Sequence, residues 1–158
     1  MELEKAKEIA EKMKALLAAA CERINMDGSD QQAIIIAGSI RRQKPEVGDI
    51  ELLCIPNYIN GVDMLDAKIQ TLIRLDLLDY RLNKRGSKVY GPKNKLLVHV
   101  VSGIGVDIFS TTEECWPVAL VVRTGGKETN KRIATAALKK GYQFHAYGRG
   151  FTTPTGEI

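Results

Sequence analysis

"AGSIRRQKPEVGDIELLCIP", residues 37–56, is the stretch that decides the fold. An apolar run ends at Ala37 and breaks at a Gly-Ser pair, and a second apolar run carries Asp49 and Glu51. In a strand, residues i and i+2 project to the same face, so the two carboxylates are expected to lie side by side. Ile50 and Leu52 then face the opposite way, toward a core. The stretch therefore predicts two strands, the second with one polar and one apolar face.

A third acid stands in similar surroundings. Asp107 lies in "GVDIFS", an apolar strand pattern with no other charge. Carboxylates held together away from water repel unless a cation intervenes, and Mg²⁺ takes one or two such groups plus substrate phosphates. The pair Asp49 and Glu51, taken alone, also fits a plainer interpretation, in which Asp49 caps the strand and Glu51 is exposed.

The segment before the first carboxylate is suited to phosphate. Gly38 permits a turn without side-chain obstruction, and Ser39 adds a hydroxyl and a main-chain N–H. A strand-to-turn junction of this kind can hold phosphate oxygens, particularly where a helical turn begins. Arg41 and Arg42 offer planar guanidinium groups, and Gly48 lets a ligand approach the backbone. Phosphate donors beside metal-binding acids indicate nucleotidyl transfer, in which two metal ions activate the attacking oxygen and stabilise the leaving pyrophosphate.

Hydrophobic periodicity orders the other elements. The predicted helices cover residues 2–24, 62–79 and 127–140, and the predicted strands cover residues 33–37, 49–55, 88–90, 95–101 and 105–110. This order predicts an α/β fold of the α+β type, in which a mixed central sheet is backed by helices.

The size of the chain, 158 residues, is typical of one domain or of one domain with a small appendage. No apolar stretch approaches the roughly 18 residues of a membrane span, and no signal-peptide pattern opens the chain. We therefore expect a cytoplasmic protein with no membrane partner. Cys21, Cys54 and Cys115 are spaced too widely for a disulfide framework or a zinc site, so free thiols are expected.

Basic residues gather in one segment. The net charge is +4, and residues 81–95 hold six basic side chains and no acidic one. A polyanion such as DNA is a candidate ligand there, because each neutralised phosphate releases counterions. A solvated hairpin that happens to be basic is the alternative.

Three motifs together resemble the DNA polymerase X family, the polymerase beta-like enzymes. They are "GSIRRQKPEVGDIE", "VDIF" and "RTGGKETNKRIATAALKKGY". The family pattern is a Gly-Ser-x-Arg-Arg segment, a DxD pair eleven residues after the glycine, a third strand Asp, and Thr-Gly-Ser-x-x-x-Asn. The resemblance extends from the first helix to about Gly148. It implies a nucleotidyltransferase palm, which we expect over residues 1–113, and a shortened thumb-like segment over residues 114–158.

The resemblance also implies roles for individual residues. Asp49, Glu51 and Asp107 would be the catalytic acids and would hold two Mg²⁺ ions, with Mn²⁺ as the alternative ion, and Asp107 would help to activate the attacking 3′ hydroxyl. The implied nucleotide-binding residues are Gly38, Ser39, Arg42 and Gly48 at the phosphates, Thr124, Gly125 and Gly126 beneath the sugar, and Asn130 at the base. The candidate DNA-binding residues, taken from the basic segment and from the basic side of the last predicted helix, are Lys84, Arg85, Lys88, Lys127 and Lys131.

The sequence departs from the family pattern at several positions. Glu51 stands where the polymerases usually have Asp, Val122 and Arg123 replace an aromatic pair, and Gly126 replaces a serine. Ala134 stands where the family places an arginine against the template strand. No counterpart of the lyase domain or of the fingers is found in the sequence, which therefore resembles the small viral and phage-type members.

Three hypotheses for the function follow. The first is a minimal, monomeric DNA polymerase X that adds deoxynucleotides from nucleoside triphosphates to a DNA 3′ end, in gapped or primer-template DNA during repair. The second keeps the chemistry but transfers the nucleotide to a tRNA end, a protein or a small molecule, because the template-facing arginine is absent. The third is a non-catalytic nucleic-acid-binding module, whose binding would be sensitive to salt but indifferent to magnesium.

Overall fold

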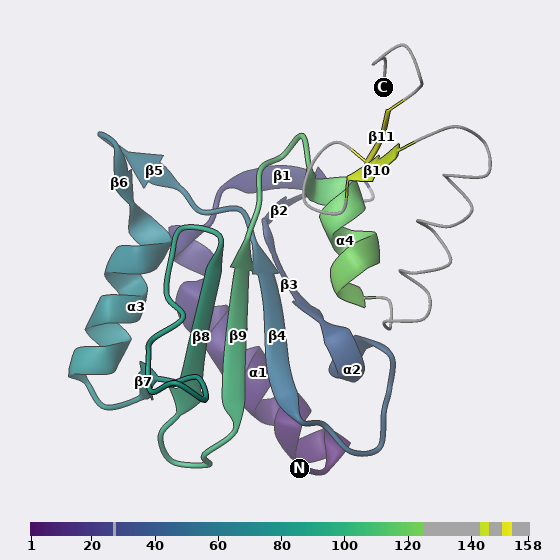
Figure 1. Ribbon diagram of the computed structural model, residues 1–158. Coiled ribbons are helices and arrows are strands. Elements are labelled where there is room, and N and C mark those ends of the chain that lie inside the picture. Colours follow the sequence, from purple (N-terminus) through teal and green to yellow (C-terminus); the bar gives the residue numbers. More distant parts are fainter. Residues whose placement is uncertain (27, 125–142, 146–149, 153–158) are drawn as a thin grey trace.

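The structure, a computed structural model, describes residues 1–26, 28–124, 143–145 and 150–152 (Figure 1). In chain order its elements are α1 (Leu3–Leu17), the 3₁₀ turn η1 (Ala18–Ala20), β1 (Arg23–Met26), β2 (Ser29–Gln32), β3 (Ile34–Ala37), α2 (Gly38–Arg41), β4 (Asp49–Cys54), β5 (Tyr58–Ile59), β6 (Val62–Asp63), α3 (Met64–Arg74), β7 (Leu78–Tyr80), β8 (Asn94–His99), β9 (Gly105–Ser110), α4 (Trp116–Thr124), β10 (Gln143–His145) and β11 (Gly150–Thr152).

A mixed sheet forms the centre of the molecule. Within the described residues it has five strands, in the order β3-β4-β9-β8-β7. β4 and β9 run parallel, while every other neighbouring pair in this sheet is antiparallel. The predicted fold class, a mixed sheet backed by helices, is therefore confirmed.

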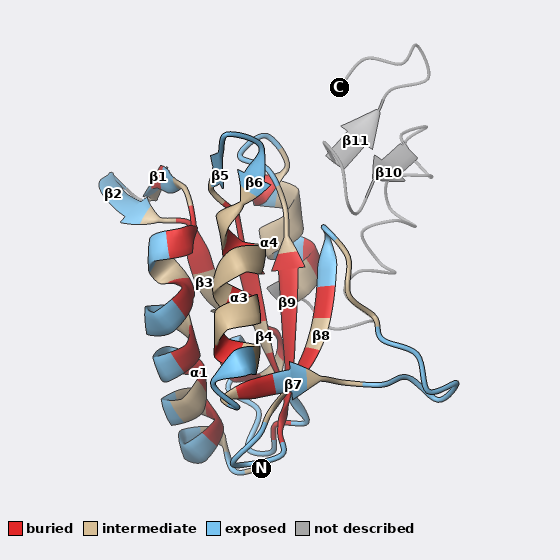
Figure 2. Ribbon diagram, turned by 90° about the vertical axis from the view of Figure 1, so that its left-hand side faces the viewer, coloured by how far each residue is buried: buried red, intermediate tan, exposed pale blue. Residues whose placement is uncertain are grey.

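One face of the sheet carries the main core. α1 and α3 cover this face, as the two views of the ribbon show (Figures 1 and 2). In β4 the alternate residues Ile50, Leu52 and Cys54 are fully buried against them, as the i, i+2 pattern predicted. α1 contributes residues spaced three and four apart along one stripe, which are Ala6, Ala10, Met13 and Leu17. This packing fixes which side of β4 and β9 is left for polar residues.

The opposite face is covered in part by α4. Trp116 of this helix is buried in a second core cluster together with Leu53 of β4 and Phe109 of β9. Leu53 follows Glu51 by two positions in β4, and Phe109 follows Asp107 by two positions in β9. Leu53 and Phe109 therefore lie on the same face of the sheet as these two acids. Asp49, at the start of β4, keeps a side chain that is 49% exposed. The end of this face that begins at Asp49 is therefore open to solvent.

Two predicted helices are too long. α1 ends at Leu17 instead of continuing to residue 24, and β1 and β2 form a hairpin there. Cys21 pairs with Pro56, and the Glu22 N–H donates to the Ile55 carbonyl, so sheet pairing overrides the helical propensity of this segment.

The second helix is shorter than predicted at both ends. α3 begins after Asp63, whose Oδ1 accepts the Asp66 N–H at 3.0 Å and caps the helix. It ends at Arg74, and Asp76 then adopts a left-handed φ of 59° that turns the chain into β7.

Other predictions of local structure have mixed outcomes. Residues 88–90 do not form a strand, because within the described residues this segment makes only isolated bridges, Leu82 to Lys88 and Tyr90 to Lys95. α4 was not predicted, and the helix predicted over 127–140 lies outside the described residues. The three cysteines are free thiols, as expected. In the described ranges, every helix is too short or too polar to cross a membrane.

Candidate active site

The register of β4 and β9 places the three acids on one face of the sheet. Asp49 is opposite Gly105, and Glu51 is opposite Asp107, in a parallel pairing. Residues opposite each other in neighbouring strands share a face, and so do Asp49 and Glu51 at i and i+2. Asp107 is 8% exposed, whereas Asp49 lies at the open end of the strand. Residues that are 58 positions apart in the sequence are thus brought together.

The electrostatics of this face favour a positive charge. Burial raises the pKa of the Glu51 carboxyl, and the charge of Asp107 raises it further, while Arg123 and Arg42 act in the opposite direction. Burial also raises the pKa of Asp107, where Arg81 partly offsets the effect and Asp49 adds to it. The Glu51 and Asp107 carboxyls are therefore costly to ionise beside the neighbouring acids, and a cation near them would lower that cost.

The Gly-Ser turn lies directly against Glu51. Ala37 pairs with Glu51 across β3 and β4, and Gly38 then turns the chain with a left-handed φ of 63°. A Cβ atom at position 38 would overlap the Glu51 carboxylate. Only glycine satisfies both conditions, since it alone adopts this backbone without strain and leaves room for the carboxylate.

α2 carries the candidate phosphate-binding residues next to the acids. Ser39 is half-buried in the first turn of this short helix, and Arg42 is exposed at its end, where its N–H donates to the Gly38 carbonyl. The charge of Arg42 acts on Glu51, so the two side chains belong to one electrostatic site. No described heavy atom, other than those of its chain neighbours, lies within 4 Å of a Cβ built at Gly48, so the backbone there is open to approach.

The substitution Gly38→Ala is expected to destabilise the chain by about 2 kcal/mol or more, because alanine is strained at this φ and its methyl group displaces the Glu51 carboxylate. Gly48→Ala is the matched control, since its methyl group meets open space, and its effect is expected to stay within about 0.5 kcal/mol. Urea unfolding of both variants measures the difference. Equal free energies of unfolding for the two variants would contradict this account of the turn.

Two arginines that the sequence analysis did not select as site residues also reach this face. Arg81 contacts Asp49 and Asp107, at 3.3 Å and 2.5 Å. The Cζ atom of Arg123, near the end of α4, lies 3.6 Å from the ring centroid of Phe109. Arg123 stands in the motif that the sequence analysis quoted, but as a departure from the family pattern. Arg81 begins the basic segment 81–95, but nothing near it in the sequence links it to the acids, because Asp49 and Asp107 are 32 and 26 residues away.

The carboxylates fit a divalent cation by their chemistry. They supply hard oxygen donors on one face, and the exposed Asp49 leaves a path for an ion to enter. As the side chains stand in the described ranges, no three His, Cys, Asp or Glu residues are gathered closely enough to hold a metal ion. The guanidinium of Arg81 already lies between Asp49 and Asp107, which shows that the site accepts a positive group.

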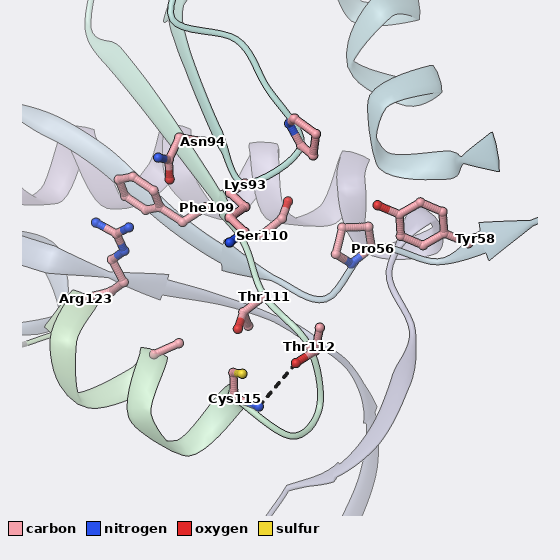
Figure 3. A pocket seen from close by; sticks show the side chains of 12 residues that line it. Pro56, Tyr58, Lys93, Asn94, Phe109, Ser110, Thr111, Thr112, Cys115 and Arg123 are labelled. Carbon is pink, nitrogen blue, oxygen red and sulfur yellow. Dashed lines mark hydrogen bonds between the residues drawn. The ribbon is translucent and has the colours of Figure 1, made fainter. Parts of the chain in front are cut away.

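A cavity of about 540 Å³ lies between α4 and the end of β9, and none of the three acids lines it (Figure 3). Phe109 and Arg123 line it, and Phe109 is two residues beyond Asp107 on the same face of the strand. Ser110 also lines it, and its Oγ is the one buried side-chain oxygen or nitrogen of the described residues without a hydrogen-bond partner. The volume is within the range of small-molecule sites.

The basic segment forms the connection between β7 and β8. Figure 2 shows this loop projecting from the sheet on the side away from α1. Lys84, Arg85 and Lys88 are exposed on it, and Lys88 Nζ lies 3.9 Å from the centroid of the Tyr80 ring.

Of the other predicted site residues, Thr124 ends α4. Those outside the described residues are Gly125, Gly126, Lys127, Asn130 and Lys131.

Comparison with known proteins identifies the fold. No protein-family model matches the sequence, and no curated protein matches it significantly. Two solved structures of Leishmania infantum polymerase beta match with TM-scores of 0.72 and 0.71, each at 20% sequence identity; one is a ternary P/T complex and the other a ternary gap complex. The matches cover 97% of this chain but 57% and 51% of the two polymerase chains. The chain therefore has a polymerase beta-like fold and spans a little over half the length of these structures.

Proposed function

We propose that this chain is a divalent-metal-dependent nucleotidyltransferase that adds deoxynucleotides to a DNA 3′ end. The observation that carries the proposal is the parallel register of β4 and β9, which gathers Asp49, Glu51 and Asp107 on one face beside the Gly38 turn. The polymerase beta-like fold supports it, since the two matching structures are ternary complexes. Filling of short gaps during repair is the reaction that we infer, with a monomer as the active form.

The proposed reaction joins the 3′ oxygen of the DNA end to the α-phosphorus of a nucleoside triphosphate. The new O–P bond forms as the bond between the α-phosphorus and the bridging oxygen breaks. The electron pair of that broken bond leaves with pyrophosphate, and the proton of the hydroxyl passes toward Asp107. Two Mg²⁺ ions, or Mn²⁺, would supply Lewis acidity at the attacking and leaving oxygens.

Each group of residues has a defined part in this reaction. Asp49, Glu51 and Asp107 hold the cations, while Ser39 and Arg42 hold the β and γ phosphates, with the open backbone of Gly48 nearby. The hydroxyl and the guanidinium suit phosphate oxygens because one donates a single hydrogen bond and the other a planar pair.

The remaining substrate contacts are proposed from where the residues lie in the fold or in the sequence motifs. The cavity bounded by Phe109 and Arg123 gives the nucleotide room at the α4 end of the acid face. We assign Thr124, Gly125 and Gly126 to the sugar and Asn130 to the base. The basic residues assigned to the DNA backbone are Lys84, Arg85, Lys88, Lys127 and Lys131. We also propose that a palm ends near residue 113 and that a shortened thumb-like segment follows.

Primer extension on a gapped duplex tests the proposal. With Mg²⁺ or Mn²⁺ and labelled deoxynucleotides, the chain is expected to lengthen the primer, and Asp49→Asn is expected to abolish this activity because it removes a cation-holding charge. Asp79→Asn, an exposed aspartate on β7, is the matched control.

Three other results would contradict the proposal in different ways. Extension that survives Asp49→Asn would remove the assignment of the metal site. Label that appears on a tRNA end, a protein or a small molecule, but never on a primer, would favour a different acceptor. Salt-sensitive DNA binding without any transfer, unaffected by Mg²⁺ or by loss of Asp107, would favour a binding module.

A further inference from the structure

Arg81 joins two of the three candidate metal ligands. Its Nη1 lies 3.3 Å from Asp49 Oδ1, and its Nη2 lies 2.5 Å from Asp107 Oδ1. The two acids are on different strands, so one guanidinium bridges β4 and β9. The Arg81 side chain is 29% exposed, and that of Asp107 is 11% exposed, so this ion pair is shielded from water more than ordinary surface pairs are.

The sheet register explains how Arg81 reaches the acids. Its N–H donates to the Leu96 carbonyl at 3.2 Å, and Leu96 is opposite Asp107, which is opposite Glu51. Arg81 therefore lies in the same row across the sheet as two of the acids. Its side chain extends over β8 to the next row of this face, where Asp49 is opposite Gly105.

Gly105 provides the space that the guanidinium fills. A Cβ atom at this position would overlap both Arg81 Nη1 and Asp49 Oδ1. Gly105 has no left-handed φ to explain the glycine, because its backbone is that of a regular strand. The absence of a side chain at Gly105 therefore leaves the room that the Arg81 guanidinium occupies.

We propose that Arg81 is an internal counter-cation of the carboxylate site and that a divalent metal ion binds there in competition with its guanidinium. This inference rests on the proposed function, because it concerns the same three acids. Without a metal ion, the arginine limits the repulsion among the carboxylates. When a metal ion binds, the guanidinium has to move away from Asp49 and Asp107. The same carboxylate oxygens cannot coordinate the ion and also keep their hydrogen bonds to Arg81.

A purely structural ion pair makes the opposite prediction for metal binding. If Arg81 only fixed the acids in place, its loss would disorder them and weaken the binding of a metal ion. If Arg81 competes, its loss strengthens that binding. The sign of the change in affinity therefore separates the two roles.

Titration calorimetry of the full chain with MnCl₂ and no nucleotide measures that sign. Arg81→Gln is expected to bind Mn²⁺ about tenfold more tightly than the unmodified chain, because a unit positive charge within a few ångströms has been removed. Arg81→Lys keeps the charge but offers one nitrogen in place of a fork, so its affinity is expected to lie between the two. Arg74→Gln removes the same charge from the exposed end of α3 and is expected to change the affinity less than about twofold.

Thermal unfolding in EDTA gives a readout that needs neither metal nor activity. Arg81→Gln is expected to lower Tm by about 2–4 °C, because the acids lose their counter-cation. This loss should shrink when Asp49→Asn is added, since the double variant has less repulsion to relieve. If Arg81→Gln does not fold, Arg81→Lys decides the sign of the affinity change.

The outcomes separate this inference from the proposed function. Mn²⁺ affinity that is unchanged or weaker in both Arg81 variants, with Asp49-dependent primer extension by the unmodified chain, overturns the inference alone. Absence of both Mn²⁺ binding and nucleotide transfer in the unmodified chain overturns the proposed function and the competition with it. A tenfold gain in affinity together with the lower Tm in EDTA supports both parts of the inference.

Discussion

Asp107→Asn is expected to lower the rate of primer extension by about 10³-fold while the chain remains folded. Asparagine has nearly the same shape as aspartate, but it cannot carry the negative charge that we propose holds a cation and draws the proton from the 3′ hydroxyl. Asp107 is 8% exposed and stands opposite Glu51 in the neighbouring strand. Single-turnover extension of a gapped duplex with saturating Mg²⁺ measures the chemical step separately from DNA binding.

Asp76→Asn is the matched control for this loss. Asp76 is exposed beyond the end of α3, and asparagine tolerates its left-handed φ at least as well as aspartate does. The control should extend primers at the unmodified rate, and both variants should unfold cooperatively. A rate for Asp107→Asn within tenfold of the unmodified chain would remove Asp107 from the catalytic site.

The central strands β4 and β9 were more predictable than the ends of the helices. β4 and β9 are short apolar runs bounded by turn residues, so pattern alone located them. In β4 the carboxylates alternate with Ile50 and Leu52, which are buried on the α1 side. The ends of α1 and α3 depended on contacts that a local pattern does not contain. Residues 21–26 leave the helix because they pair with distant backbone, and Asp63 begins α3 because its side chain caps the Asp66 N–H.

The candidate site was predictable only in part for the same reason. That Asp49 and Glu51 share a face follows from strand geometry, and that Gly38 turns the chain follows from its residue type. The pairing of Glu51 with Asp107 depends on strand register, which was implied by the family resemblance and not by the pattern. Arg81 could not be predicted, because its position beside the acids needs both the β7–β8 pairing and the empty space at Gly105.

Glu51→Gln is expected to reduce primer extension by about 10²-fold to 10³-fold, the size of the loss when one group that stabilises transition-state charge is removed. The amide keeps the shape of the side chain against Gly38 but loses the charge. Burial and the charge of Asp107 raise the pKa of Glu51, so this carboxylate is costly to keep ionised without a cation beside it. Glu46→Gln, an exposed residue paired with the N-terminal amine, is the control and should leave the rate unchanged.

The substitution Glu51→Asp tests the length of this side chain separately from its charge. Aspartate keeps the charge but withdraws the carboxylate by one methylene, about 1.5 Å, and a shift of this size is expected to cost about tenfold to 10²-fold in rate. The withdrawn carboxylate also leaves the space beside Gly38, so Gly38→Ala should destabilise the Glu51→Asp chain about 1 kcal/mol less than the unmodified one. The backbone strain at the left-handed φ remains in both backgrounds, so the difference reports the contact alone. Strict additivity of the two substitutions, or an unchanged rate for Glu51→Asp, would mean that Gly38 and Glu51 are not matched in size and that the longer acid is incidental.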